Sequence, residues 1–73
     1  MSLSKDIRNL RNKALLSQED FAIILGVSLA SVNRWEVGKS IPNITAMKAL
    51  KKYCEKNSFP FGTIEEDWIK ERK

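Results

Sequence analysis

The feature that most constrains this sequence is a three-residue break, Gly26-Val27-Ser28, between two short helical patterns. Glycine adopts the left-handed conformation that ends a helix at little cost, and serine is a favoured helix N-cap. One helix is therefore expected to end at Gly26 and the next to begin after Ser28. A connection this short restricts the angle between two helices. The sequence predicts a rigid pair of helices joined by a tight turn.

Other helical patterns flank this pair, and no segment shows the alternation of apolar and polar residues that a half-buried strand requires. The expected helices span residues 4–14, 18–25, 29–37, 44–56 and 64–72. Ser4, Ser17 and Asn43 are the expected N-caps, and Thr63 with Glu66 forms a capping box before the last helix. The predicted fold class is all-α: a compact domain of four to five helices.

The chain has 73 residues, which is enough for one small domain. We expect residues 1–57 to form that domain and residues 58–73 to form a C-terminal extension. The short helix of the extension would pack on the domain or on a dimer partner.

Ile23 and Ile24 lie beside the apolar stripe that Phe21 and its helical neighbours form. Two interpretations are open: they pack under the last helix with Trp68, or they form an exposed patch for a partner. Internal packing is slightly favoured. The aromatic side chains of Phe59 and Phe61 raise the same question.

The charge of the chain is positive and unevenly distributed. The formal net charge is +4, and residues 1–57 carry 10 basic and 5 acidic side chains against 3 and 4 in residues 58–73. A basic body suits a polyanionic partner, for which nucleic acid is the common case. The alternative is an ordinary solvated surface, and charge alone weighs the two evenly.

The sequence lacks the side chains that catalysis or metal binding would need. The sequence has no histidine and a single cysteine, Cys54, which excludes the usual zinc ligand sets and a Cys–His nucleophile pair. Its adjacent carboxylates fall in first turns of predicted helices, where they suit the helix dipole. We expect no catalysis, no metal and no cofactor.

Localisation is expected to be cytoplasmic. A lone cysteine suits a reducing compartment. No apolar run approaches the ~20 residues that span a bilayer, and no signal peptide is apparent. We expect no membrane association.

Residues 7–57 resemble the Xre, Cro and lambda-repressor-like family of helix-turn-helix transcriptional regulators. The matching segments, in order, are Leu16-Ser17-Gln18-Glu19-Asp20-Phe21-Ala22, Leu25-Gly26-Val27-Ser28, Val32-Asn33-Arg34-Trp35-Glu36, Gly38-Lys39 and Pro42. The string is specific as a whole because each segment also fits a cap, a hydrophobic contact or a helix stop. One departure is Leu15, where the family often has the glycine that ends the first helix.

The resemblance implies that helix 29–37 inserts into the major groove of double-stranded DNA, braced by helix 18–25. The expected base-contacting residues are Ser28, Leu29, Ala30, Ser31, Asn33 and Arg34. Arg34 is the strongest candidate because a guanidinium can bind guanine O6 and N7 together. A phosphate contact or a surface salt bridge is an equally weighted alternative for Arg34. Leu29 and Ala30 suit only a thymine methyl group.

The expected phosphate contacts are Gln18, Lys39, Ser40 and Asn43. Gln18 opens a helix, where the positive end of the helix dipole supports phosphate binding. A capping role competes with DNA contact at Asn43. The resemblance also implies a partly buried, structural ion pair between Arg11 and Glu36. Trp35 is expected to be a core residue rather than a stacking platform.

We therefore expect a sequence-specific DNA-binding transcriptional regulator, with repression favoured over activation. A homodimer on a two-fold site is expected because one small domain contacts little DNA. The alternative is a protein-interaction module or an antitoxin-type protein that binds a partner such as a toxin and keeps only weak DNA binding. The apolar pair Leu29-Ala30, the pair Ile23-Ile24 and the aromatic tail motivate this alternative.

Overall fold

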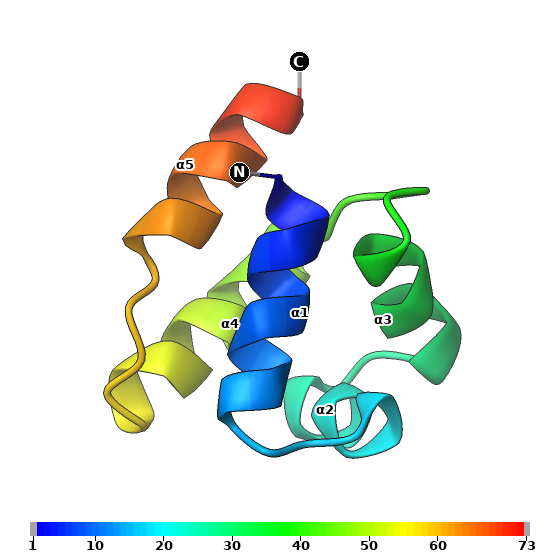
Figure 1. The fold of residues 1–73 in the computed structure, drawn as a ribbon, viewed down its shortest axis with the longest axis vertical. Helices are drawn as coiled ribbons and strands as arrows, with labels where there is room; N and C mark the ends of the chain where they lie inside the picture. The colour runs from blue at the N-terminus through cyan, green and yellow to red at the C-terminus, as the bar shows by residue number, and fades with distance from the viewer. Residues whose placement is uncertain (1, 73) are drawn as a thin grey trace.

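The computed structural model describes residues 2–72, in which five α-helices and no strands are present. The helices are α1 (Leu3–Lys13), α2 (Gln18–Leu25), α3 (Leu29–Glu36), α4 (Ile44–Lys56) and α5 (Gly62–Glu71). Figure 1 shows α1 through the middle of the molecule, with α3 on one side, α5 on the other and α2 below. The all-α prediction is confirmed. No helix in residues 2–72 has both the length and the apolar character needed to cross a membrane.

The predicted caps of the three central helices are confirmed. The side chain of Ser17 accepts a hydrogen bond from the Asp20 N–H at 3.0 Å. Ser28 caps α3 and Asn43 caps α4 in the same way, at 3.1 and 2.8 Å. Each cap satisfies a backbone donor that the first turn of a helix leaves unpaired. The sequence around these caps therefore determines where α2, α3 and α4 begin.

The predicted starts of the two outer helices are wrong. Helix α1 begins at Leu3 and is capped by Ser2 rather than Ser4. The longer helix brings the Leu3 side chain into the core. Helix α5 begins at Gly62, and its N-cap residue, Phe61, makes no side-chain capping bond. Because Phe61 already has a helical conformation, Thr63 lies within the first turn and not at the capping position of the predicted box.

The turns on both sides of α2 use the left-handed conformation. Gly26 ends α2 with a φ of 70°, as predicted, and the following Val27 N–H donates to the Ala22 carbonyl at 3.0 Å. Leu15 has a φ of 60° and is 91% exposed. Leu15 thus adopts the conformation for which the family often supplies glycine, at a steric cost that glycine would not have.

All five helices contribute to one core. Its fully enclosed side chains include Leu3, Ile7, Phe21, Val32, Leu50 and Cys54. Helix α5 packs against α1, and the indole Nε1 of Trp68 donates to the Pro42 carbonyl at 2.6 Å. Phe59 and Phe61 are partly buried against the core. The aromatic residues of the C-terminal segment are therefore used for internal packing.

Ile23 and Ile24 do not pack under the last helix, and the favoured interpretation is wrong. They are 72% and 48% exposed. Phe21, Ala22 and Leu25 fill the inward face of α2. Figure 1 shows α2 at the bottom of the view and α5, the helix of Trp68, at the upper left. The two isoleucines form an apolar surface on α2.

Candidate nucleic-acid interface

The solvent side of α3 presents the side chains that the sequence indicates for base contact. Val32, Trp35 and Glu36 point inward and are buried. The remaining positions face solvent because the helical period separates them from this buried stripe. Ser28, Leu29, Ala30, Asn33 and Arg34 are exposed, and Ser31 is half-buried. The six candidates therefore lie on or beside one accessible helix.

Polar groups at the two ends of α3 differ in what they already bind. At the N-terminal end, the Ser28 Oγ accepts from the Ser31 N–H, and the two hydroxyls lie 3.0 Å apart. At the C-terminal end, Arg34 forms no ion pair within residues 2–72. The guanidinium of Arg34 thus has its donors directed to solvent.

The candidate phosphate contacts flank the C-terminal end of α3. The Gln18 Nε2 donates to Glu36 Oε1 at 3.1 Å, which places the first turn of α2 beside this end. Lys39 and Ser40 lie in the loop after α3, and both of their N–H groups point back to the Arg34 carbonyl, at 2.9 and 3.4 Å. Their side chains are exposed. The structure therefore brings Gln18 and the loop after α3 to the same end of that helix.

Asn43 is exposed and lies at the start of α4. Its Oδ1 is used to cap α4, as described above, while its amide Nδ2 forms no hydrogen bond within residues 2–72. An asparagine side chain has separate donor and acceptor atoms. Capping and contact with an external acceptor are therefore compatible at this residue.

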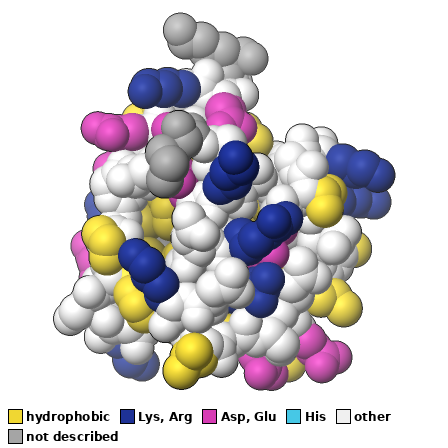
Figure 2. Space-filling model, viewed as in Figure 1, with side chains coloured by type: hydrophobic (Ala, Val, Ile, Leu, Met, Phe, Trp, Pro, Cys, Tyr) yellow, Lys and Arg dark blue, Asp and Glu magenta, His cyan; other side chains and the backbone are white. Residues whose placement is uncertain are grey.

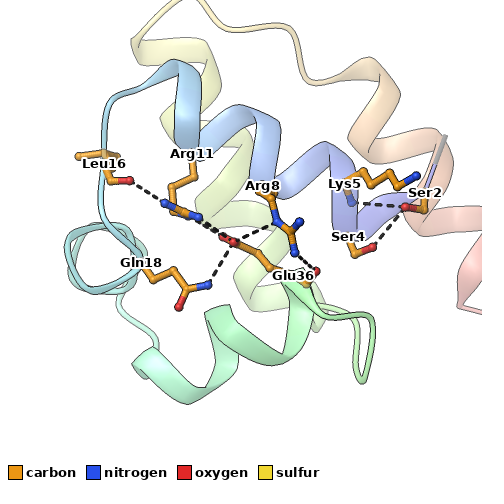
Figure 3. Close-up of polar contacts among 8 residues, drawn as sticks. All are labelled: Ser2, Ser4, Lys5, Arg8, Arg11, Leu16, Gln18 and Glu36. Atoms are coloured by element: carbon orange, nitrogen blue, oxygen red, sulfur yellow. Dashed lines mark hydrogen bonds and ion pairs between the residues drawn. The ribbon is translucent and has the colours of Figure 1, made fainter.

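The buried carboxylate of Glu36 joins α1, α2 and α3 (Figure 3). Arg11 Nε donates to Glu36 Oε2 at 2.6 Å, and Arg11 Nη2 donates to Oε1 at 2.8 Å. Arg11 Nη1 also reaches the Leu16 carbonyl at 2.9 Å, just before α2. The structure therefore contains the ion pair that the resemblance implied. Two parallel hydrogen bonds between planar groups fix orientation as well as distance.

Arg8 is a second cation on Glu36 that the sequence analysis missed. Its Nη2 donates to the Glu36 backbone carbonyl at 2.9 Å, and its Nε lies 3.7 Å from Oε1. The first contact satisfies a carbonyl at the end of α3, where a positive charge also complements the helix dipole. The sequence could have indicated this contact, because Arg8 precedes Arg11 by three residues and the two therefore lie on one face of α1.

The protonation state of Glu36 follows from these contacts. Burial alone would raise the pKa of this carboxyl. The hydrogen bonds from Arg11 and Gln18 and the charges of Arg11 and Arg8 outweigh burial, so the pKa of Glu36 lies below its ordinary value. Glu36 is therefore ionised at neutral pH and holds α3 against α1 as a charged acceptor.

Charge is distributed unevenly over the surface. Figure 2 shows Lys and Arg side chains over the middle of the molecule and at its upper right, where Figure 1 places α1 and the loop after α3. Acidic side chains lie at the upper left, over α5, where a basic side chain lies among them, and at the bottom, by α2. The basic regions would attract a polyanion, and the acidic ones would repel it.

Neither a metal site nor a reactive thiol is evident in the part of the chain that the structure describes. No group of three His, Cys, Asp or Glu side chains gathers there in a way that would hold a metal ion. Cys54 is buried in the core. Burial, with a smaller effect of the nearby Glu55 charge, raises the pKa of its thiol to about 11. Because the thiolate is the reactive form, this cysteine is a structural residue.

Comparison with known proteins gives a family match over most of the chain. Residues 7–58 match the model of a family described as helix-turn-helix. The chain is 34% identical over 53 residues to the HTH-type transcriptional activator BcrR of Enterococcus faecalis. This alignment covers 73% of the chain but 26% of that protein, so the chain spans about a quarter of the length of this relative. No solved structure gives a significant match.

Proposed function

The chain belongs to the helix-turn-helix family of DNA-binding transcription regulators, and from this premise we propose that it reads a short duplex site with α3. The observation that carries the proposal is the combination of an exposed outer face of α3 with a buried anchor beneath it. The Arg11–Glu36 pair fixes α3 to α1, so the outer side chains are presented without a large ordering cost. A helix held in this way fits the major groove.

We propose Arg34 as the principal base contact, through two hydrogen bonds to guanine O6 and N7. Ser31 and Asn33 supply further polar contacts, and the hydroxyl of Ser28 can donate while its oxygen caps α3. Leu29 and Ala30 contact thymine methyl groups, since their side chains have no hydrogen-bonding atoms.

Phosphate contacts are assigned to Gln18, Lys39, Ser40 and Asn43. The Gln18 amide has two N–H donors, of which Glu36 accepts one and a phosphate oxygen accepts the other. Asn43 contributes its Nδ2 in the same way. Of these four residues, Lys39 is the one that carries a positive charge. These contacts set the register of α3 on the duplex and carry no sequence information.

We propose that two copies bind a two-fold symmetric site and that binding represses transcription. A single module of this kind buries only about 600–1,000 Å² on DNA, and pairing doubles that area. BcrR is an activator by name, so the direction of regulation needs its own test. A promoter reporter with the selected site between the promoter elements should lose expression when the chain is present. A gain of expression would instead assign activation.

The exposed isoleucine surface favours a second candidate function, binding of a protein partner such as a toxin. Ile24 borders a groove with Tyr53, Lys52 and Lys56, and Ile23, the preceding residue on α2, is exposed. An apolar protein contact should persist as salt rises, whereas binding through phosphates should weaken steeply. Salt dependence of binding therefore separates the two functions.

The test of DNA reading is selection from a randomised duplex library, followed by fluorescence anisotropy on the enriched sequence. We expect a short motif that the native chain and Lys56→Ala both bind and that Arg34→Ala no longer distinguishes from random duplex. Lys56 is the matched control because it is an exposed cation at the far end of α4. No enrichment, with equal affinity for all duplexes, would contradict sequence reading by α3.

A further inference from the structure

Helices α1 and α5 pack together, and each carries one buried carboxyl group that interacts with the other. Asp6 of α1 is 7% exposed and Asp67 of α5 is 8% exposed. The Oδ2 atom of each is enclosed and receives no hydrogen bond from any donor in residues 2–72. Two ionised carboxylates in this position would repel each other and leave two buried acceptors unpaired.

The charges around the pair do not neutralise it. Glu71, also on α5, adds a further negative charge, although its Oε2 is occupied by the Leu3 N–H at 2.8 Å. On α1 itself, Lys13 borders the same surface hollow as Asp6 but forms no ion pair with it. Burial first, and then the hydrogen-bonding effect and the charge of the neighbouring Asp67 carboxyl, raise the pKa of Asp6 to about 6.

We propose that Asp6 and Asp67 share one proton, which bridges α1 and α5, and that loss of this proton loosens α5 from the domain. A single proton turns one carboxyl into a donor, so that it satisfies the enclosed oxygen of the other. The pair then resembles other carboxyl pairs at close range, which cannot both ionise without cost.

Release of α5 would also reach the loop that leads into α4. Trp68 is the neighbour of Asp67 on α5, and its indole donates to the Pro42 carbonyl at 2.6 Å in a buried contact. Pro42 directly precedes Asn43, the cap of α4. Through this hydrogen bond, loosening of α5 would also release the loop between α3 and α4. Any effect of the proton on DNA affinity rests on the proposed function, which assigns this loop to the phosphate backbone.

The sign of the pH dependence follows from the raised pKa. The folded chain holds this proton more tightly than the unfolded chain, in which the pKa of Asp6 is near 3.8. The stabilisation is complete at low pH and is lost as pH rises through about 6. Between pH 5 and pH 7 the folding equilibrium constant should fall about tenfold. Glu36, whose pKa is lowered, does not titrate in this window.

The decisive variant is Asp67→Asn, which replaces the shared proton with a permanent amide donor. Glu66→Gln is the matched control because it removes one negative charge from the adjacent, exposed position of α5. Urea unfolding at pH 5 and pH 7 should show the tenfold fall for the native chain and Glu66→Gln, and less than about a twofold change for Asp67→Asn. If Asp67→Asn does not fold, Asp6→Asn places the same donor on α1.

Hydrogen exchange of the Trp68 indole N–H gives a second readout. At pH 7 it should be slower in Asp67→Asn than in Glu66→Gln, and at pH 5 the two should agree. Equal pH dependence of unfolding in both variants, or equal exchange at pH 7, would overturn the proposal. Duplex affinity is measured on the same variants. Absence of any duplex binding would contradict the proposed function and leave the unfolding result to decide on the shared proton.

Discussion

At the scale of single residues, Glu36 has the largest influence on how α3 is held. It is 4% exposed and accepts hydrogen bonds from Arg11 and Gln18, while Arg8 binds its backbone carbonyl. Because the pKa of Glu36 is lowered in the folded chain, its contribution to stability is present above pH 4.5 and is lost as pH falls below it.

Substitution Glu36→Gln should therefore destabilise the domain. It leaves the charge of Arg11 without its partner in a largely enclosed position, and disrupting a buried pair costs about 3 kcal/mol. Urea unfolding at pH 7 measures this change. Glu55→Gln, at an exposed site on α4, should change the free energy of unfolding by less than about 0.5 kcal/mol. Equal effects of the two substitutions would show that the network contributes nothing specific.

Replacement of Leu15 by glycine should stabilise the folded domain. Its φ of 60° is unfavourable for a side chain with a β-carbon, and its exposure means that little burial is lost on truncation. We expect Leu15→Gly to raise the free energy of unfolding by about 0.5–1 kcal/mol. Thermal and urea unfolding check this prediction. A decrease would indicate that the Leu15 side chain makes a stabilising contact.

At the scale of helices and turns, the sequence predicted correctly those helix starts that local hydrogen bonds determine. The caps of α2, α3 and α4 are local hydrogen bonds between a side chain and a backbone group three residues later. Such interactions can be read from neighbouring residues alone. The start of α5 depends instead on how Phe61 packs against the core, which no local pattern encodes.

Long-range contacts account for the other differences from the sequence prediction. The Trp68–Pro42 hydrogen bond and the Asp6–Asp67 pair join residues far apart in the chain. Packing of Ile23 and Ile24 under the last helix was the slightly favoured interpretation, and it is wrong because α5 occupies another side of the molecule (Figure 1). The outer face of α3, in contrast, follows directly from helical periodicity, and its residues were identified from sequence.

The turn between α2 and α3 gives a prediction at this scale. Gly26 has a φ of 70° and open space around its α-carbon, so Gly26→Ala should cost about 1 kcal/mol through backbone strain alone. Gly62→Ala is the matched control, since Gly62 is helical without a positive φ and also has open space. It should stabilise by roughly 0.5 kcal/mol because alanine favours the helix. Both values come from urea unfolding. Identical signs would contradict the conformational argument.

At the scale of the whole molecule, the asymmetric charge should orient the chain on a polyanion. Basic side chains lie over α1 and the loop after α3, whereas acidic side chains lie over α5 and by α2 (Figure 2). A duplex drawn to the loop after α3 lies beside the C-terminal end of that helix and away from α5. Such steering increases the association rate and weakens with ionic strength.

Lys39→Ala tests this account of the electrostatics. Removal of one phosphate contact should weaken binding to all duplexes similarly and reduce the slope of log affinity against log salt by about 1. Lys56→Ala removes the same charge at the far end of α4 and should leave the slope unchanged. Anisotropy titrations at several salt concentrations give both slopes. Equal changes in slope would mean that general charge, and not the loop after α3, carries the interaction.

The most direct test of the central claim is an NMR titration of the isotope-labelled chain with its selected duplex. The account predicts that amide shifts concentrate in residues 28–34, at Gln18 and in the loop from Lys39 to Asn43. The amides near Ile23 and along the C-terminal half of α4 should remain unchanged. Shifts centred on Ile23, Ile24 and the lysines of α4, with α3 unaffected, would contradict DNA reading by α3. They would place the functional surface at the two isoleucines and the groove that Ile24 borders with α4.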